Sequence, residues 1–296
     1  MRKVICTNDD GVSVSFSYEE SAKFFLHSID GVTSIKNKVT TSENTTVDGS
    51  TYQGSVVKQR NIVITAEMNE STSEAHQELR DILYSCFKPK STGTLKFQEG
   101  SLRPRIIQYK VEDLDVDPDG GPERYATISL ICTDPLFKDE EDIIVTMAGW
   151  DTGFEWIHEF VEEGEEFGSR TAEITKTIEN DSAADYIGIE IDIVATGTVV
   201  NPAMYHEEEA EHIKIGTDVK PFTMQAGDVL KITTGTNEKD VVLTSAGSSK
   251  SVNEYLDENA EFIQLIHGKN TFTYAADTGR DYMDVSIKYR LRYLGV

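Results

Sequence analysis

Alternating apolar and polar positions predict that most of the chain forms β-strands. In NIVITAEM, residues 61–68, every second residue is apolar: Ile62, Ile64, Ala66 and Met68. A period of two is typical of a strand that buries one face. The segments RKVIC, GVSVSFS, RIIQYKVEDL and ATISLIC in the first 140 residues also predict strands, because Gly, Asn, Asp and Pro bound them.

One segment has a different period and predicts a helix. STSEAHQELRDILYSCF has apolar residues at helical spacing: Ala75, Leu79, Ile82, Leu83, Cys86 and Phe87. Ser71 with Glu74, or Ser73 alone, is expected to cap its start. Pro89 and Gly93 end it. One helix among strands predicts a sheet or sandwich with the helix packed on it.

A boundary is expected at CTDPLFKDEED, where Pro135 ends a strand and an acidic run follows. The formal net charge is −6 in residues 1–140 and −18 in residues 141–296. We therefore expect two domains with these bounds. Residues 141–171 are expected to form an acidic connecting arm, whose aromatic side chains dock on one or both domains: Trp150, Phe154, Trp156, Phe160 and Phe167.

The second domain is predicted to be almost entirely β. Short strands with regular turns favour a β-sandwich or jelly roll. In DYIGIEIDIVATG the isoleucines share one face, and Glu190 and Asp192 share the other. In MDVSIKYRLRYLGV the outward residues include Lys288 and Arg290. Opposite charges favour cross-strand pairing, so strands 186–196 and 282–291 are predicted to be neighbours.

Composition limits the function classes. The 296 residues are 38% apolar and 27% charged, as in globular proteins, with a net charge of −24. Sequence-specific nucleic-acid binding is not expected, because it needs clustered basic residues. No apolar run approaches the roughly 20 residues of a membrane helix. MRKVICTNDD lacks the apolar core of a signal peptide, so synthesis in a cytoplasm is expected.

Two segments have an incomplete metal-binding spacing. In HEEEAEH, His206 and His212 are six residues apart, whereas a zincin helix needs histidines four apart. A solvated hairpin loop is the main interpretation, and adventitious metal binding is the alternative. The second segment begins like a calcium loop, with Asp115, Asp117 and Asp119, but its twelfth position is Ala126 where a glutamate is needed. An acidic hairpin turn is favoured over a calcium site.

No catalytic or cofactor-binding residue is predicted. The chain lacks the nucleophile elbow, the phosphate-binding loop and the dinucleotide fingerprint. Cys6, Cys86 and Cys132 are far apart and form no C-x-x-C, so buried free thiols are expected. One feature without chemistry is the basic pair Lys58 and Arg60, which precedes the strand at 61–68.

Several longer segments, in order, carry a family resemblance. In the first domain they are TTVDGSTYQGSVVKQRNIVITAEM, FKPKSTGTL and ISLICTDPLF. In the second they are EEGEEFGSR, ATGTVVNPAM, FTMQAGDVLKITT, YLDENAEFIQLIHGKNTFTYAAD and the terminal YLGV. Together they resemble distal tail proteins of long, flexible-tailed phages and prophages of Gram-positive bacteria. The resemblance runs nearly end to end.

The resemblance implies a structural protein of the virion tail tip. It implies an N-terminal domain similar to tail-tube subunits, which forms a homohexameric ring, and a galectin-like C-terminal β-sandwich. Such a ring joins the tail tube protein to the tail-tip hub or tail-associated lysin protein, anchors receptor-binding proteins and lets DNA pass. In that setting Lys58 and Arg60 are expected to meet acidic groups of a neighbouring subunit. Pairing within one subunit is the alternative.

Three other functions stay open. A carbohydrate-binding module contacting the cell wall needs an aromatic platform, and TVVNPAM supplies Asn201 without an adjacent aromatic residue. A major tail-tube subunit would not need a second all-β domain of this size. An enzyme would have to hydrolyse the cell wall, and no motif in the sequence supports that.

Overall fold

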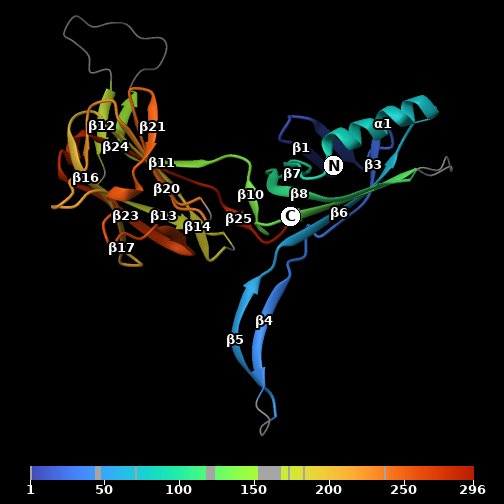
Figure 1. Ribbon diagram of the computed structural model, residues 1–296, viewed down its shortest axis with the longest axis horizontal. Helices are drawn as coiled ribbons and strands as arrows, with labels where there is room; N and C mark the ends of the chain where they lie inside the picture. The colour runs from blue at the N-terminus through green and yellow to red at the C-terminus, as the bar shows by residue number, and fades with distance from the viewer. Residues whose placement is uncertain are drawn as a thin grey trace, which may run out of the picture. The chain divides into compact units, whose positions relative to one another are not determined.

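The computed structural model describes residues 2–43, 48–70, 72–117, 124–152, 168–172, 174–182, 184–236 and 238–296. The chain is mainly β and divides into two compact units (Figure 1). Unit 1 comprises Met1–Glu140 and Arg292–Val296, and unit 2 comprises Glu141–Leu291. Residues 292–296, expected in the second domain, therefore belong to the first unit. No helix in the described ranges is both long and apolar enough to cross a membrane.

Unit 1 is built on a nine-stranded sheet in the order β25-β10-β8-β7-β1-β2-β3-β6-β9. Because β8 also pairs with β9, the sheet closes on itself as a barrel. Its strands are β1 (Arg2–Asn8), β2 (Ser13–Ser17), β3 (Phe24–Asp30), β6 (Arg60–Met68), β7 (Thr92–Glu99), β8 (Arg105–Val116), β9 (Tyr125–Cys132), β10 (Phe137–Asp139) and β25 (Arg292–Tyr293). The last of these strands comes from the C-terminus.

The predicted alternation in β6 is confirmed. Ile62, Ile64, Ala66 and Met68 are all buried in the barrel core, whereas the residues between them are partly exposed. The strand pairs on both sides, with β3 and with β9, so its backbone hydrogen bonds are made within the barrel. This is why a strand with one apolar face is stable in this position.

The predicted helix is confirmed as α1 (Ser73–Cys86), with a different cap and a narrower buried face. Thr72 is the N-cap, because its side-chain oxygen accepts a hydrogen bond from the Ala75 N–H at 3.2 Å. His76 is buried, whereas Ile82 is 36% exposed although its spacing predicts burial. Phe87, directly after the helix, is also buried. The helix itself turns a stripe of four residues to the core: His76, Leu79, Leu83 and Cys86.

Unit 2 contains a seven-stranded and a five-stranded sheet. The first has the order β12-β11-β24-β15-β19-β20-β21. Its strands are β11 (Ile143–Thr152), β12 (Gly168–Ala172), β15 (Glu190–Ala195), β19 (Val229–Thr233), β20 (Asp240–Ser245), β21 (Ser248–Ser251) and β24 (Met283–Tyr289). The second has the order β13-β23-β16-β17, with β18 beside β16. Its strands are β13 (Thr175–Asn180), β16 (Val199–His206), β17 (Glu211–Lys214), β18 (Thr223–Met224) and β23 (Gly268–Thr278).

Small elements complete unit 2. The strands β14 (Tyr186–Gly188) and β22 (Gln264–Ile266) pair as a separate two-stranded sheet. Two 3₁₀ turns, η1 (Asn253–Tyr255) and η2 (Arg280–Tyr282), connect longer strands. The expected strand 186–196 is therefore interrupted, and its two parts belong to different sheets.

The predicted pairing of the charged strands is confirmed for β15 and β24. Glu190 lies opposite Lys288, whose Nζ is 3.0 Å from the Glu190 carboxylate and 2.5 Å from that of Asp192. Arg290 does not join this cluster, because β24 ends at Tyr289. Its Nε donates to Asp142 at 2.6 Å instead.

The expected connecting arm at 141–171 is wrong for the described parts of that range. Residues of β11 and β12 pair with each other inside the seven-stranded sheet, with Trp150 opposite Arg170. Strong β propensity in IIVTMA favours this strand over an arm. The remaining aromatic residues of the expected arm lie outside the described residues: Phe154, Trp156, Phe160 and Phe167.

Candidate assembly surface

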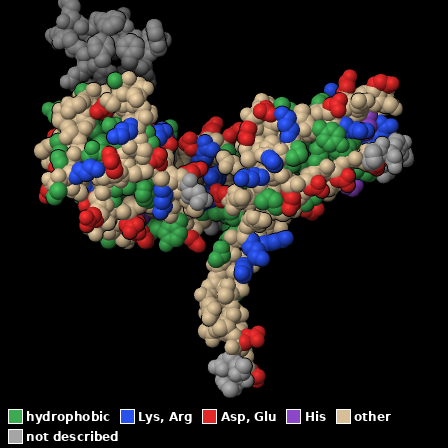
Figure 2. Space-filling model, in the orientation of Figure 1, with side chains coloured by type: hydrophobic (Ala, Val, Ile, Leu, Met, Phe, Trp, Pro, Cys, Tyr) green, Lys and Arg blue, Asp and Glu red, His purple; other side chains and the backbone are tan. Residues whose placement is uncertain are grey.

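A two-stranded ribbon in unit 1 is the first candidate for a functional surface. It consists of β4 (Asn37–Glu43) and β5 (Ser50–Val57), which in the described chain pair only with each other. The ribbon extends away from the barrel (Figure 1). Lys and Arg side chains gather at its base, and few charged side chains lie along it (Figure 2). An isolated two-stranded ribbon is at best marginally stable in water, and burial against another surface would stabilise it.

Large apolar side chains are exposed along the ribbon. The exposed fractions are 55% for Val39, 62% for Tyr52, 70% for Val56 and 45% for Val57. β-Branched and aromatic residues explain why these segments form strands, but nothing in the described chain covers them. By register, Val39 and Val57 share one face of the ribbon and Val56 lies on the other, so apolar side chains are exposed on both faces. Several exposed apolar side chains on one element are typical of an interaction site.

A register shift bends the ribbon. Thr40 lies opposite Gly54, and the pairing slips by one residue before Thr41 lies opposite Tyr52. Gly54 has a φ of +151°, and a Cβ built there would meet nothing within 4 Å. Such bulges increase local twist and bend a strand. The Tyr52 hydroxyl donates to Ser55 Oγ at 2.9 Å, which fixes the aromatic ring beside the bulge.

Lys58 and Arg60 follow the ribbon, but they lie in different environments. Lys58 is exposed, and its backbone N–H donates to the Lys36 carbonyl at 2.8 Å. Arg60 is only 4% exposed. A contact between Lys58 and a neighbouring subunit therefore stays a prediction, whereas the guanidinium of Arg60 is enclosed within its own unit.

Main-chain carbonyls of the same chain surround the guanidinium of Arg60, as in the alternative of pairing within one subunit. The group lies over the Phe137 ring, 5.0 Å from its centre. Burial lowers the pKa of Arg60. Its hydrogen bonds run to the carbonyls of Pro135 at 2.7 Å, Gly31 at 2.6 Å, Val32 at 3.0 Å and Ser34 at 3.1 Å, and to that of Leu294.

His206 and His212 do not converge on a shared site. They lie on the paired strands β16 and β17, where His206 is opposite Glu211 and His212 is opposite Tyr205. Opposite residues share a face and successive residues alternate, so the two imidazoles are on opposite faces. Residues 207–210 form the turn of a hairpin between these strands, which confirms the predicted hairpin.

Each histidine has its own local contacts. His206 is buried and stacks on Phe272 with ring centres 4.8 Å apart, and its Nε2 is 3.6 Å from Glu208. His212 stacks on Tyr205 at 5.5 Å and is 3.6 Å from Asp257.

Two of the three aspartates in the segment that begins like a calcium loop lie among the described residues. Asp115 and Asp117 lie at and just beyond the end of β8, and Asp119 lies outside the described residues. Over the described ranges, no group of three or more His, Cys, Asp or Glu side chains is arranged to hold a metal ion.

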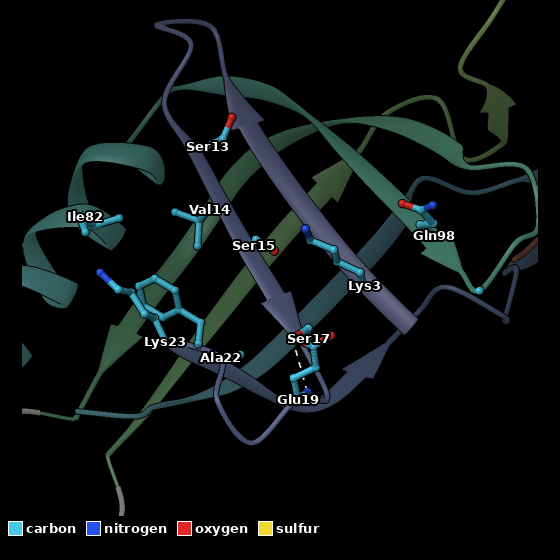
Figure 3. Close-up of a pocket in the computed structure, with 12 residues that line it drawn as sticks. Lys3, Ser13, Val14, Ser15, Ser17, Glu19, Ala22, Lys23, Ile82 and Gln98 are labelled. Carbon is cyan, nitrogen blue, oxygen red and sulfur yellow. Dashed lines mark hydrogen bonds between the residues drawn. The ribbon is translucent and has the colours of Figure 1, made fainter. Parts of the chain in front are cut away.

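A hollow of about 620 Å³ in unit 1 is the second candidate surface. It lies between β2, the start of β3 and α1, and Ile82 points toward Val14 (Figure 3). Phe24 contributes to its apolar wall, and Lys3 and Lys23 supply ammonium groups. The lining offers apolar contact and hydrogen bonding. The helical spacing of the sequence could not reveal this hollow, because that spacing places Ile82 on the buried face of α1.

The sequence and the fold of the chain were compared with those of known proteins. Residues 13–132 match the family model described as the phage tail protein RIFT-related domain. The matched residues of unit 1 are therefore similar to a phage tail RIFT-related domain. They include the β4–β5 ribbon, β6 and α1, and they begin at the first residue of β2. A search of curated proteins finds no match.

The likeness in fold extends beyond these residues to the whole chain. The Dit protein of phage SPP1, titled a paradigm of hub adsorption apparatus in phages infecting Gram-positive bacteria, aligns with a TM-score of 0.69 and 13% identity. The alignment covers 98% of this chain and 99% of SPP1 Dit. A chain of the activated phage P2 baseplate with calcium aligns with a TM-score of 0.52 and 12% identity over 100% of both chains. These matches confirm the resemblance to phage distal tail proteins and support a structural role in a phage tail.

Proposed function

We propose that the chain is a subunit of a homohexameric ring at the tip of a phage tail. The observation that carries the proposal is the solitary β4–β5 ribbon with its exposed apolar side chains, in a chain with the fold of SPP1 Dit. A surface of this kind needs burial to be stable. A second copy of the chain supplies that burial, because the same ribbon is present on every copy.

In this proposal the ring joins the tail tube protein to the tail-tip hub and anchors receptor-binding proteins. Unit 1 forms the ring, and unit 2 is a galectin-like β-sandwich that holds the outward partners. The net charge of −24 per chain suits a ring through which DNA passes, because a negative wall repels phosphate. The protein is made in the cytoplasm of a bacterial host and ends in the virion.

The test measures the mass of the purified full chain in solution and images it in negative stain. Discrete rings with six times the chain mass support the proposal. Long tubes favour the tail-tube subunit, and a monomer at every accessible concentration contradicts self-assembly. Val39→Lys should abolish the ring by placing a charge on the ribbon face that carries Val39 and Val57. Val219→Lys, at a position 96% exposed in unit 2, is the matched control and should leave the ring intact.

A second function is favoured by a smaller hollow of about 150 Å³ in unit 2. Tyr186, which is 55% exposed, and Phe262 line it together with Gln264 and Glu261. The Lys239 ammonium lies 5.4 Å from the centre of the Phe262 ring, so Tyr186 is the open aromatic side chain of the hollow. An aromatic side chain beside polar groups is the combination of a saccharide site that the sequence lacked near Asn201. Binding to a glycan array by the wild type and its loss in Tyr186→Ala would support this function. No binding above background would remove it.

A further inference from the structure

In the described part of unit 1, β2 and β3 are joined by very little strand pairing, and we call this place the seam. β2 pairs with β1 from Lys3↔Ser17 to Thr7↔Ser13, whereas its register with β3 is the single pair Ser17↔Phe25. The edge of β2 that faces β3 therefore lacks a strand partner along Ser13–Phe16 within the described residues. An unpaired strand edge is a template for pairing with an added strand.

The 620 Å³ hollow lies at this seam. Val14, Ser15 and Ser17 of β2 line it together with Phe24 and Ile82. Val14 and Phe24 are 2% and 5% exposed, so the lining includes buried apolar side chains. Ile82 is 36% exposed and points toward Val14 (Figure 3). A strand entering here would gain main-chain hydrogen bonds on one side and apolar contacts on the other.

The β4–β5 ribbon has the complementary features. Both of its outer edges are unpaired in the described chain, and its apolar side chains are open to solvent. The two strands, NKVTTSE and STYQGSVV, carry one Lys and one Glu in total, and β2, SVSFS, carries no charge. Pairing between them therefore brings no like charges opposite each other.

We infer that the β4–β5 ribbon of one copy docks against the β2 edge and hollow of the next copy. This inference rests on the proposed ring and specifies the contact between neighbouring subunits, which we call the joint. Donor and acceptor are different surfaces of the same unit, so the contact is heterologous. Heterologous contacts that close on themselves generate rings. Each copy thus fills its neighbour's seam and has its own seam filled.

Cross-linking of single-cysteine additions tests the joint. Ser15→Cys marks the acceptor edge, and Val39→Cys or Val56→Cys marks the donor ribbon; all three positions are exposed in the single chain. The native thiols, Cys6, Cys86 and Cys132, are buried and give little background. A short bismaleimide added to mixed acceptor and donor variants should yield a covalent dimer. Ser15→Cys mixed with Ser249→Cys, a unit 2 position in β21, is the matched control and should not.

Two variants on the same helix separate the hollow from general surface effects. Ile82→Lys places a charge in the hollow and should weaken assembly at least about tenfold. Tyr84→Lys is the control, because Tyr84 is 48% exposed on α1 but does not line the hollow. Circular dichroism of both variants checks that the fold is intact.

The outcomes separate this inference from the proposed function. Hexameric rings without a Ser15-to-ribbon cross-link, or rings equally stable in Ile82→Lys and Tyr84→Lys, overturn the joint and leave the ring standing. A monomer in every condition, without cross-links, overturns both. Rings, the specific cross-link and selective weakening by Ile82→Lys together support the joint.

Discussion

Arg60 donates a hydrogen bond to the main-chain carbonyl of Leu294, which lies 234 positions further along the chain. Residues 292–296 therefore belong to unit 1, although they follow all of unit 2 in the sequence. A second arginine acts in the same way: Arg105 donates to the Gly295 carbonyl and lies 3.9 Å from the centre of the Tyr293 ring. Two guanidinium groups thus anchor the end of the chain.

Replacing Arg60 by methionine should destabilise unit 1 by about 1–3 kcal/mol, because five main-chain carbonyls lose this donor and that of Val32 is buried. Urea denaturation followed by hydrogen exchange on unit 1 peptides measures the change, with the largest loss of protection in β10 and β25. Lys58→Met, at an exposed position two residues away, should change stability by no more than about 0.5 kcal/mol. Equal effects of the two variants would contradict the role of Arg60 as an anchor.

Two glycines with nearly equal φ separate backbone strain from steric clash. Gly11 has a φ of +81° and Gly31 of +83°, but only at Gly31 would a Cβ meet another atom, the Asn61 carbonyl oxygen at 2.0 Å. Gly11→Ala should cost about 1–2 kcal/mol, the penalty of the left-handed conformation. Gly31→Ala should cost clearly more, because β3 and β6 must separate to relieve the clash. That movement also displaces the Gly31 carbonyl, which accepts a hydrogen bond from Arg60. Similar unfolding midpoints in urea for the two variants would argue against the clash.

The periodicity of the sequence correctly predicted those strands whose own residues specify which face is buried. The alternation in β6 and the charge pattern of β15 and β24 both specify a face, and a face is what a strand buries. The same alternation, continued back by one step, places Arg60 on the face of Ile62, so the signal for its burial was present. The charge of the arginine favoured a surface interpretation, because carbonyl partners distant in sequence are not visible in it.

Features that depend on tertiary pairing could not be predicted in this way. The return of Arg292–Val296 to unit 1 depends on pairing between β25 and β10. The open seam beside β2 depends on which strand neighbours it. The exposure of Ile82 reflects where α1 lies over the barrel, since its spacing alone fits a buried position.

The N-cap of α1 gives a third test. Thr72→Ala should destabilise unit 1 by about 1 kcal/mol, because the Ala75 N–H loses its acceptor. Ser73→Ala should have a smaller effect, since Ser73 is already the first helical residue. Thermal unfolding of both variants measures the difference. A larger loss in Ser73→Ala would restore the cap expected from the sequence.

The three thiols should be unreactive in the folded protein. All three cysteines are buried, and burial raises the pKa of Cys86 to about 11 and that of Cys132 to about 12. Thiolate is the reactive form, so a thiol reagent at pH 8 should modify none of them within minutes. Three equivalents should react after denaturation in guanidinium. Rapid modification of the native protein would contradict the buried positions.

The ion pairs between β15 and β24 should make unit 2 less stable in acid. Partial burial raises the pKa of Glu190, but hydrogen bonds from Lys231 and Lys288 outweigh that effect and hold the pKa below its ordinary value. A carboxyl with a depressed folded-state pKa contributes stability above its unfolded pKa, about 4.3, and that contribution disappears as the pH falls through the folded value.

Lys288→Met should therefore reduce the stability of unit 2 by about 1 kcal/mol at pH 7, and the difference from wild type should shrink below about pH 4. Urea midpoints between pH 7 and pH 3 measure it. Lys250→Met is the matched control, because the Lys250–Glu254 pair is 3.7 Å apart and its side chains are 73% and 57% exposed. A Lys288→Met difference that stays constant down to pH 3 would mean that packing of the lysine stem, and not its charge, stabilises the strand pair.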